Sequence, residues 1–213
     1  MSAQGFAFER RVGYILELLK GRLEESGWVF LIHDEQQVRD FFKEQSLNGV
    51  DHMLQVQDPA GEQHLFFIQE KWKLITNQRE VSQFLDCCAR ILARMPEYKG
   101  LIHRFWVSRT VPSLNGEKSL QEGQCMIVQT CTSQTLLALN ALLVICDILK
   151  CRGQAIEIVA NIGSLLPNQD EAIPDPKVAV EEPQNTFEPV SNFGEKRVLP
   201  ITNKTVVMVK KVD

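Results

Sequence analysis

Two strand-like segments joined by a short turn constrain this chain more than any other feature. Residues 50–57 (VDHMLQVQ) and 64–73 (HLFFIQEKWK) are rich in the apolar and aromatic residues that are typical of buried strands. Between them, residues 58–61 (DPAG) form a turn sequence. Two strands connected in this way predict an antiparallel β-hairpin.

Because side chains alternate across a strand, the hairpin sorts its polar residues between two faces. Gln69, Lys71 and Lys73 fall on one face of the second strand, and Glu70 falls on the other. Asp51 joins the first group if the register of the two strands allows it. Carboxylate and amide oxygens are hard ligands that suit Mg²⁺ or Mn²⁺, and a nearby lysine can orient or deprotonate water. The hairpin therefore predicts a metal-assisted phosphodiesterase site.

Further helices and strands are predicted on both sides of the hairpin. Residues 78–95 carry apolar side chains at helical spacing throughout, and Pro96 ends this helix. The order of elements favours an α/β domain with a mixed sheet flanked by helices on both faces. The remaining expectations are a helix over 3–25, strands over 28–32, 101–108 and 126–130, a loop or short helix over 34–47, a loop over 112–123, and an apolar helix over 133–150.

The length of 213 residues suits one domain with an appendage. We expect the domain over residues 1–164, because proline and acidic residues become frequent from about residue 165. Residues 165–213 are predicted to form a Pro/acid-rich linker and a C-terminal arm that ends in a hairpin.

The composition of the chain indicates in which compartment we expect the protein and which classes of partner it favours. No apolar run is long enough for a membrane span, and the first residues lack the apolar core of a secretory signal. We therefore expect a cytoplasmic protein with no membrane partner and with reduced, mostly buried cysteines. The net charge of −4 argues against a protein that coats nucleic acid through bulk charge, but it permits a local grip on a phosphate backbone.

The residues of the hairpin resemble the signature of the PD-(D/E)XK nuclease superfamily, whose fold is called restriction-endonuclease-like. That signature is an aspartate, a turn, and a strand carrying (D/E/Q)-x-K, and here it stands as GVD at 49–51 and IQEK at 68–71. The glutamine variant is similar to Mrr-type restriction endonucleases. GFAFE at 5–9 resembles the G-x-x-F-E helix of that group, whose glutamate reaches the metal site. The likeness covers roughly residues 3–110.

Carried over by position, the resemblance implies a role for each polar residue. Asp51 would be the principal metal ligand, Gln69 would offer its carbonyl oxygen, and Lys71 would act on the water or the scissile phosphate. Glu9 would be a second carboxylate near the metal, which matters because Gln69 is neutral. Glu70 remains an alternative acid to Gln69, through a bulge or an E-x-x-K spacing, although strand parity favours Gln69.

Three hypotheses of function result. The first is an endodeoxyribonuclease that depends on Mg²⁺ or Mn²⁺ and cuts duplex DNA, and the resemblance implies a homodimer. The second is a catalytically inactive nuclease-fold module that binds nucleic acid or protein. The third is an assembly protein that uses residues 165–213 to bind partners. We expect His52 to be a satisfied core histidine, and Trp72 and Trp106 to pack in the core rather than stack on bases.

Overall fold

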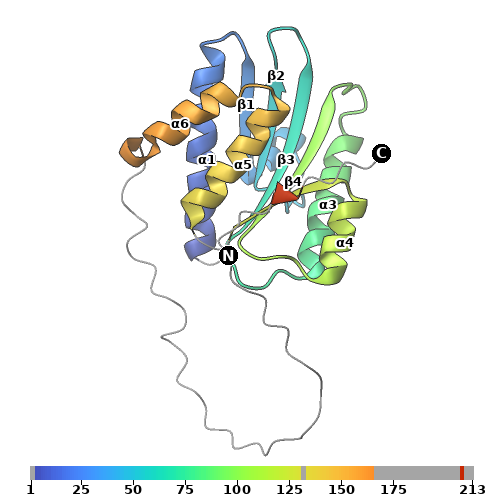
Figure 1. Cartoon of the computed structure of the whole chain (residues 1–213). Helices are drawn as coiled ribbons and strands as arrows, with labels where there is room; N and C mark the ends of the chain where they lie inside the picture. Colours follow the sequence, from blue (N-terminus) through green and yellow to red (C-terminus); the bar gives the residue numbers. More distant parts are fainter. Residues whose placement is uncertain (1–2, 131–132, 166–206, 209–213) are drawn as a thin grey trace, which may run out of the picture.

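A mixed β-sheet with helices on both faces forms the centre of the molecule (Figure 1). The computed structural model describes residues 3–130, 133–165 and 207–208. The sheet has six strands in the order β1-β2-β3-β4-β5-β6. This arrangement confirms the predicted α/β class.

The helices and strands follow one another along the chain as α1 (Ala3–Glu24), β1 (Val29–Asp34), α2 (Glu35–Phe42), β2 (His52–Gln57), β3 (Gln63–Lys71), α3 (Gln78–Ala93), β4 (Leu101–Ser108), α4 (Leu114–Glu122), β5 (Cys125–Gln129), α5 (Gln134–Ile148), α6 (Arg152–Leu165) and β6 (Val207–Met208).

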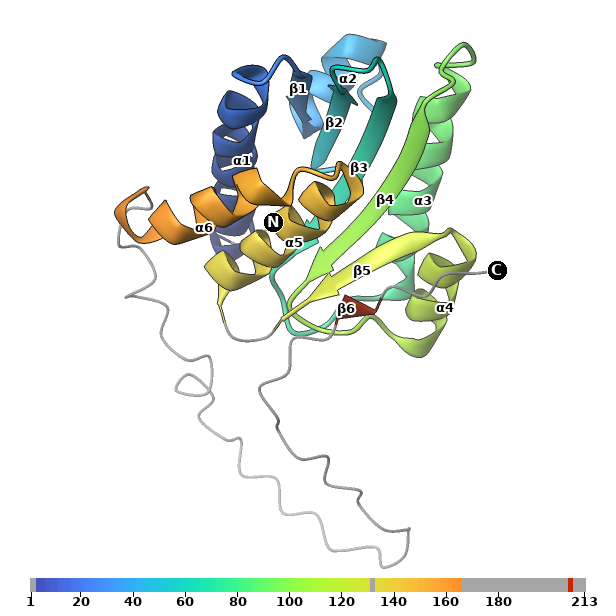
Figure 2. The ribbon, with the colours of Figure 1, turned by 45° about the horizontal axis from the view of Figure 1, so that its top comes forward.

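The predicted hairpin is present as β2 and β3. These strands pair antiparallel from His52 opposite Ile68 to Gln57 opposite Gln63. Their turn closes through Asp58, whose backbone N–H donates to the Glu62 carbonyl oxygen at 3.0 Å. β1 pairs antiparallel with β2, whereas β3, β4 and β5 run parallel and side by side (Figure 2). The sheet therefore changes from antiparallel to parallel at β3.

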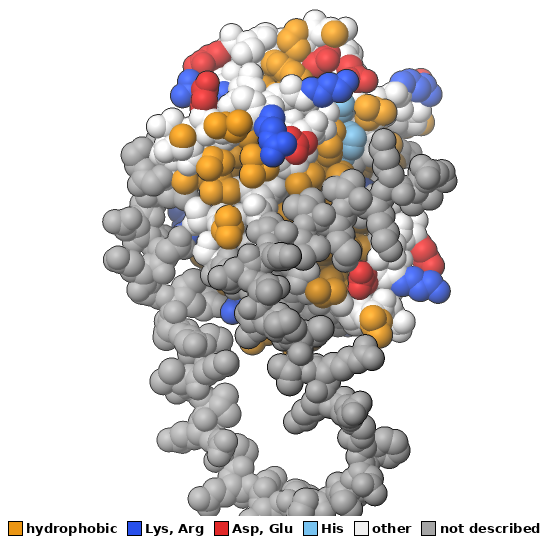
Figure 3. Space-filling model, in the orientation of Figure 1, with side chains coloured by type: hydrophobic (Ala, Val, Ile, Leu, Met, Phe, Trp, Pro, Cys, Tyr) orange, Lys and Arg blue, Asp and Glu red, His pale blue; other side chains and the backbone are white. Residues whose placement is uncertain are grey.

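Two separate hydrophobic cores lie on the two faces of the sheet. The first packs α1, α5 and α6 against one face, and the second packs α3 and α4 against the other. Hydrophobic side chains are also visible in several groups on the outer surface where α1, α5 and α6 lie (Figure 3). The largest fully buried side chains of the two cores are Phe8, Phe30, Phe66 and Phe105 in the first, and Phe67, Phe84 and Trp106 in the second.

The structure corrects the prediction of a loop over 112–123. Residues Leu114–Glu122 form α4, which begins where the Ser113 side chain accepts a hydrogen bond from the Gly116 backbone N–H. Leu120 then packs in the second core. Leu120 is the only buried leucine of these nine residues, which is too little of an apolar pattern to predict a helix, whereas the capping Ser113 was an available local signal. Helix α6 was not anticipated either.

The strand parity of one residue was also predicted wrongly. Strict alternation along residues 50–57 places Val50 on the same face as Leu54, but Val50 packs in the second core while Leu54 packs in the first. The reason is that β2 begins only at His52, so the alternation does not extend back to residue 50.

The expectations for the C-terminal arm lie mostly outside the described residues. Within them, Val207–Met208 pair antiparallel with β5. None of the helices in the described part of the chain has both the length and the apolar character that crossing a bilayer requires. The described cysteines are free thiols, buried at Cys87, Cys88, Cys146 and Cys151 and partly buried at Cys125, as predicted.

The packing of α1 yields a first prediction. Leu19 is fully buried on the apolar stripe of this helix, within the first core. Leu19→Ala should lower the free energy of unfolding by about 2–5 kcal/mol, because it removes buried methyl groups and leaves a cavity. Urea denaturation measures the change. Leu136→Ala, at an exposed position on α5, should stay within about 0.5 kcal/mol. Equal losses in the two variants would contradict this packing.

Candidate functional site

Asp51, Gln69 and Lys71 come together at one end of the hairpin, as the strand alternation predicts. Asp51 directly precedes β2, and the other two lie at the end of β3. The Gln69 side-chain amide donates a hydrogen bond to Asp51 Oδ2. The Lys71 Nζ atom lies 3.7 Å from the same oxygen. These three residues, which we call the pocket, form one closely packed cluster at the end of β3, with Asp51 and Gln69 buried and Lys71 partly exposed.

The backbone of β3 fixes the Asp51 carboxylate in this pocket. The Asp51 N–H donates to the Ile68 carbonyl oxygen at 2.9 Å. In return, the Glu70 backbone N–H donates to Asp51 Oδ2 at 2.6 Å. Asp51 is thus bound to four consecutive positions of β3, which satisfies a carboxylate that is almost completely buried.

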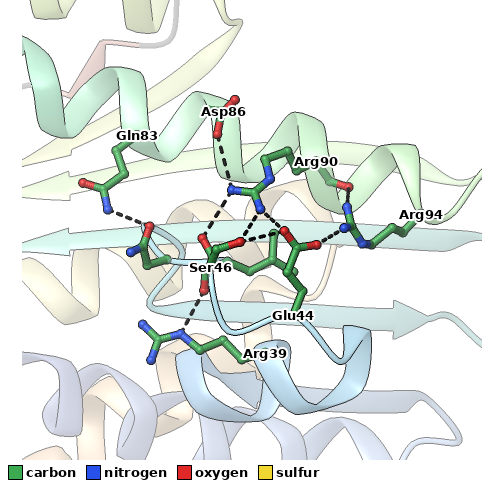
Figure 4. Close-up of polar contacts among 9 residues, drawn as sticks. Arg39, Glu44, Ser46, Gln83, Asp86, Arg90 and Arg94 are labelled. Atoms are coloured by element: carbon green, nitrogen blue, oxygen red, sulfur yellow. Dashed lines mark hydrogen bonds and ion pairs between the residues drawn. The ribbon is translucent and has the colours of Figure 1, made fainter.

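The loop before Asp51 is clamped to α3 by ion pairs (Figure 4). Glu44 binds the guanidinium groups of both Arg90 and Arg94. Arg90 also donates to the Ser46 carbonyl oxygen at 3.3 Å and to its hydroxyl at 2.6 Å. We call the contacts of residues 44–49 with α2 and α3 the loop clasp. Since this loop leads directly to Asp51, the clasp sets the direction in which β2 begins.

The rest of the clasp follows the loop toward Asp51. Arg39 on α2 donates from Nε to the Leu47 carbonyl oxygen at 3.0 Å, and the Gln83 amide donates to Asn48 Oδ1 at 2.7 Å (Figure 4). Gly49 then turns the chain with φ of 110°. A Cβ at this glycine would lie 3.1 Å from the Gln83 carbonyl oxygen, so both the turn and the close approach require glycine.

Glu70 directs its side chain to the opposite face of the sheet, as strand parity predicts. Its Oε1 atom lies 2.8 Å from Nδ1 of His52, and both side chains are buried. His52 is therefore a satisfied core histidine, as expected. Glu70 contacts Asp51 through its backbone N–H, whereas the Glu70 carboxylate lies on the other face of the sheet and is not part of the pocket.

Gly13 on α1 makes room for the His52 ring. A Cβ at this position would lie 3.0 Å from His52 Nε2. The sequence reasoning did not single out Gly13, although an isolated glycine inside a helical pattern was an available signal of close packing. Glu9 lies one helical turn before Gly13, and so on the same side of α1.

Glu9 is electrostatically coupled to the pocket. Partial burial raises the pKa of Glu9 to about 8, with the negative charges of Asp51 and Glu70 adding to the effect. Lys71 and His52 act in the opposite direction. The Glu9 carboxyl thus holds its proton at neutral pH unless a further positive charge enters the site.

The other acids of the site are perturbed in the same direction. Burial raises the pKa of Asp51, while Lys71 and the Glu70 N–H lower it. Burial also raises the pKa of Glu70, to about 7, against the opposing effect of His52. For His52, burial alone would lower the pKa, but the acids around it, Glu70 first, raise it to about 9. All three carboxyl groups of the site thus have a raised pKa, with burial as the largest cause for each.

Carboxylate and amide oxygens are the kind of donor that a hard divalent cation prefers, and Mg²⁺ is commonly held by one or two carboxylates together with water. Asp51 offers one carboxylate in the pocket, and Glu9 is a second carboxyl group whose charge interacts with it. Gln69 would offer Oε1 after a half-turn of its amide, which now presents its N–H to Asp51. Within the described residues, no three His, Cys, Asp or Glu side chains form a ready ligand cluster. Any metal here would therefore depend on an amide oxygen and water.

Lys73 does not belong to the pocket, contrary to the prediction that it projects with Gln69 and Lys71. Its Nζ atom pairs with Glu80 in the first turn of α3. The physical reason is that β3 ends at Lys71, so the strand alternation does not reach residue 73.

The crowding of acids predicts a pH-dependent effect on stability. Because the pKa of Glu9 is raised from 4.5 to about 8 on folding, the folded state loses stability as pH rises through that interval. Without metal, Glu9→Gln should raise the melting temperature near pH 9 and change it little near pH 4, where the carboxyl is neutral in the folded state. Glu17→Gln, at an exposed position on α1, should show no such difference. Equal pH profiles for wild type and Glu9→Gln would contradict the coupling.

The loop clasp predicts a local loss of order. Arg90→Ala leaves Glu44 with one cation and removes both contacts to Ser46. We expect a loss of about 1–2 kcal/mol in unfolding free energy. Hydrogen exchange should accelerate at the backbone amides of residues 44–51. Arg22→Ala, which breaks an exposed pair with Glu25, is the control and should leave this loop protected. Unchanged exchange in Arg90→Ala would refute the clasp.

Comparisons with known proteins found one solved structure with partial similarity to this chain. No protein-family model and no curated protein matches the chain. One solved structure, of the MspJI restriction endonuclease in complex with a 27-mer oligonucleotide, aligns with a TM-score of 0.34 and 10% identity. The alignment covers 63% of this chain and 28% of that chain. A TM-score this low does not establish a shared fold, so the function of this chain has to be inferred from its own residues.

Proposed function

We propose that this protein is a metal-dependent endonuclease that hydrolyses phosphodiester bonds in DNA. The observation that carries the proposal is the convergence of Gln69, Lys71 and the Glu70 N–H on one oxygen of the buried Asp51. Such a buried set of acid, amide and amine costs folding free energy, which favours a functional role for it, and Lys71 is its partly exposed member.

Each residue has a role that its surroundings support. Asp51 and Glu9 would bind Mg²⁺ or Mn²⁺ through their carboxylates, and Gln69 through its amide oxygen. When bound, the cation would polarise the phosphate and lower the pKa of water. Lys71, held 3.7 Å from Asp51, would donate to a phosphate oxygen or orient the attacking water. The raised pKa of Glu9 means that metal binding would release its proton, so metal affinity should increase up to about pH 8.

The sequence motifs support a finer assignment. GVD at 49–51 and IQEK at 68–71 favour a restriction-endonuclease-like domain of the PD-(D/E)XK type, resembling the Mrr-like nucleases with Q-x-K. Under that assignment, the substrate would be duplex DNA and the active form would be a homodimer that cuts both strands. The order of α1, the hairpin, α3 and β4 is the core order that the resemblance implies.

A catalytically inactive module with the same fold is the second candidate. It is favoured by a specific observation: Lys71 and the Gln69 amide already satisfy Asp51, and Gln69 carries no charge. A pocket neutralised in this way can be stable without metal. The two candidates differ in whether cleavage occurs, and the inactive module would bind nucleic acid or protein.

Plasmid cleavage tests the proposal. Wild type should nick or linearise plasmid DNA with Mg²⁺ or Mn²⁺ and be inactive with a chelator. Asp51→Ala should abolish cleavage, and Lys71→Ala should reduce the rate about a hundredfold or more. Lys73→Ala is the matched control, because this lysine pairs with Glu80 outside the pocket, and it should cleave like wild type.

The controls separate the two candidates. Circular dichroism checks that each variant is folded, and calorimetric titration with Mn²⁺ should show binding to wild type and none to Asp51→Ala. Cleavage that persists unchanged in both site variants would show that the site is assigned wrongly. Binding of DNA by wild type without any cleavage would favour the inactive module.

A further inference from the structure

Large apolar side chains protrude into solvent at the same edge of the sheet as the pocket. Among the described residues, Leu114 and Ile75 are the most exposed large hydrophobic side chains, at 86% and 79%. Leu74 and Val111 beside them are 57% and 51% exposed. Leu74 and Ile75 belong to the loop after β3, Val111 belongs to the loop after β4, and Leu114 is the first residue of α4. Apolar groups gathered in this way are typical of a contact surface rather than of random exposure.

The two loops are held together, so the surface is preformed. The Arg109 N–H donates to the Lys71 carbonyl oxygen at 3.0 Å, and Thr110 Oγ1 donates to the Lys73 carbonyl oxygen at 3.2 Å. Farther out, the Ser113 N–H donates to the Thr76 carbonyl oxygen at 3.4 Å. Each loop also ends in a capped helix, α3 or α4. The segments that carry the apolar side chains are therefore fixed at one end by β3 and β4 and at the other end by the first turns of α3 and α4.

The surface continues directly from the pocket. Lys71 lies in the pocket through its amine and anchors the second loop through its carbonyl oxygen. The Arg109 guanidinium lies 5.2 Å from the centre of the Trp72 ring, so this cation packs on the residue that directly follows Lys71. Arg79, in the first turn of α3, is a further exposed cation. A partner that binds this surface therefore contacts positively charged and apolar side chains together.

That combination fits nucleic acid better than a purely apolar partner. Phosphates complement Arg109 and Arg79, while exposed aliphatic tips can insert between neighbouring bases and unstack them. We propose that Ile75 and Leu114 form an apolar wedge that opens a base step next to the scissile phosphate. This inference rests on the proposed function and deepens it: the substrate class is DNA that unstacks readily at the cleavage position.

A fluorescent base analogue tests the wedge directly. The probes are duplexes with 2-aminopurine at defined steps, bound in Ca²⁺, which usually replaces Mg²⁺ without supporting cleavage. Wild type should increase the 2-aminopurine fluorescence at one step, and Ile75→Ser/Leu114→Ser should lose this increase. The double variant should also cleave a fully paired duplex about ten- to a hundredfold more slowly, because it cannot offset the cost of unstacking. A duplex with an unpaired bulge at that step should restore most of the rate.

Controls separate the possible failures. Val29→Ser/Ile156→Ser removes two exposed apolar side chains elsewhere and should behave like wild type. If wild type cleaves DNA but the wedge variant matches it in fluorescence and rate, the wedge is refuted and the proposed function stands. If the variant instead turns a dimer into a monomer by light scattering, the surface binds a second copy and the wedge is again refuted. If wild type neither binds nor cleaves DNA, both proposals fall.

Discussion

The pairing of Asp51 with the end of β3 is the interaction on which the candidate site depends. A carboxylate buried this deeply costs several kcal/mol unless hydrogen bonds and charge compensate it. Here the Glu70 N–H and the Gln69 amide donate hydrogen bonds to Asp51 Oδ2, and the Lys71 amine forms an ion pair with the same oxygen. A one-residue slip of β2 against β3 would remove all three at once, because it would also reverse the faces. The position of the acid is therefore inseparable from the strand register.

β3 couples the two faces of the sheet at this position. Gln69 and Lys71 face the second core, while Glu70 between them faces α1 and binds His52. The site is thus backed by a second buried pair, under a helix that approaches closely at Gly13. Stability alone would favour apolar residues at such positions, since a buried ion pair is seldom better than good packing. The ionisable groups at this end of the sheet therefore cost stability, and they are the groups on which the proposed function depends.

Sequence reasoning was successful where a local period dictates the structure. The hairpin, the faces of Gln69 and Glu70, and helix α3 all follow from periods of two or of 3.6 residues. It failed where the period is short or interrupted, as in α4, at Val50 and at Lys73. The loop clasp could not be predicted from the sequence for a different reason. Arg90 and Glu44 are 46 positions apart, and no local sequence pattern indicates that they form a pair. The exposure of Ile75 and Leu114 could not be predicted either, because a sequence does not show which apolar side chains remain in contact with solvent.

The change from antiparallel to parallel pairing at β3 explains why all these features meet at one edge. β2 runs opposite to β3, so its beginning adjoins the end of β3; β4 runs with β3, so the two strands end together. Asp51, Lys71 and Arg109 consequently converge although they are distant in sequence. The same parallel pair leads into the loop that carries Ile75 and into the loop that ends at Leu114, the first residue of α4. The direction of the strands therefore places these two apolar side chains at the same end of the sheet as Asp51.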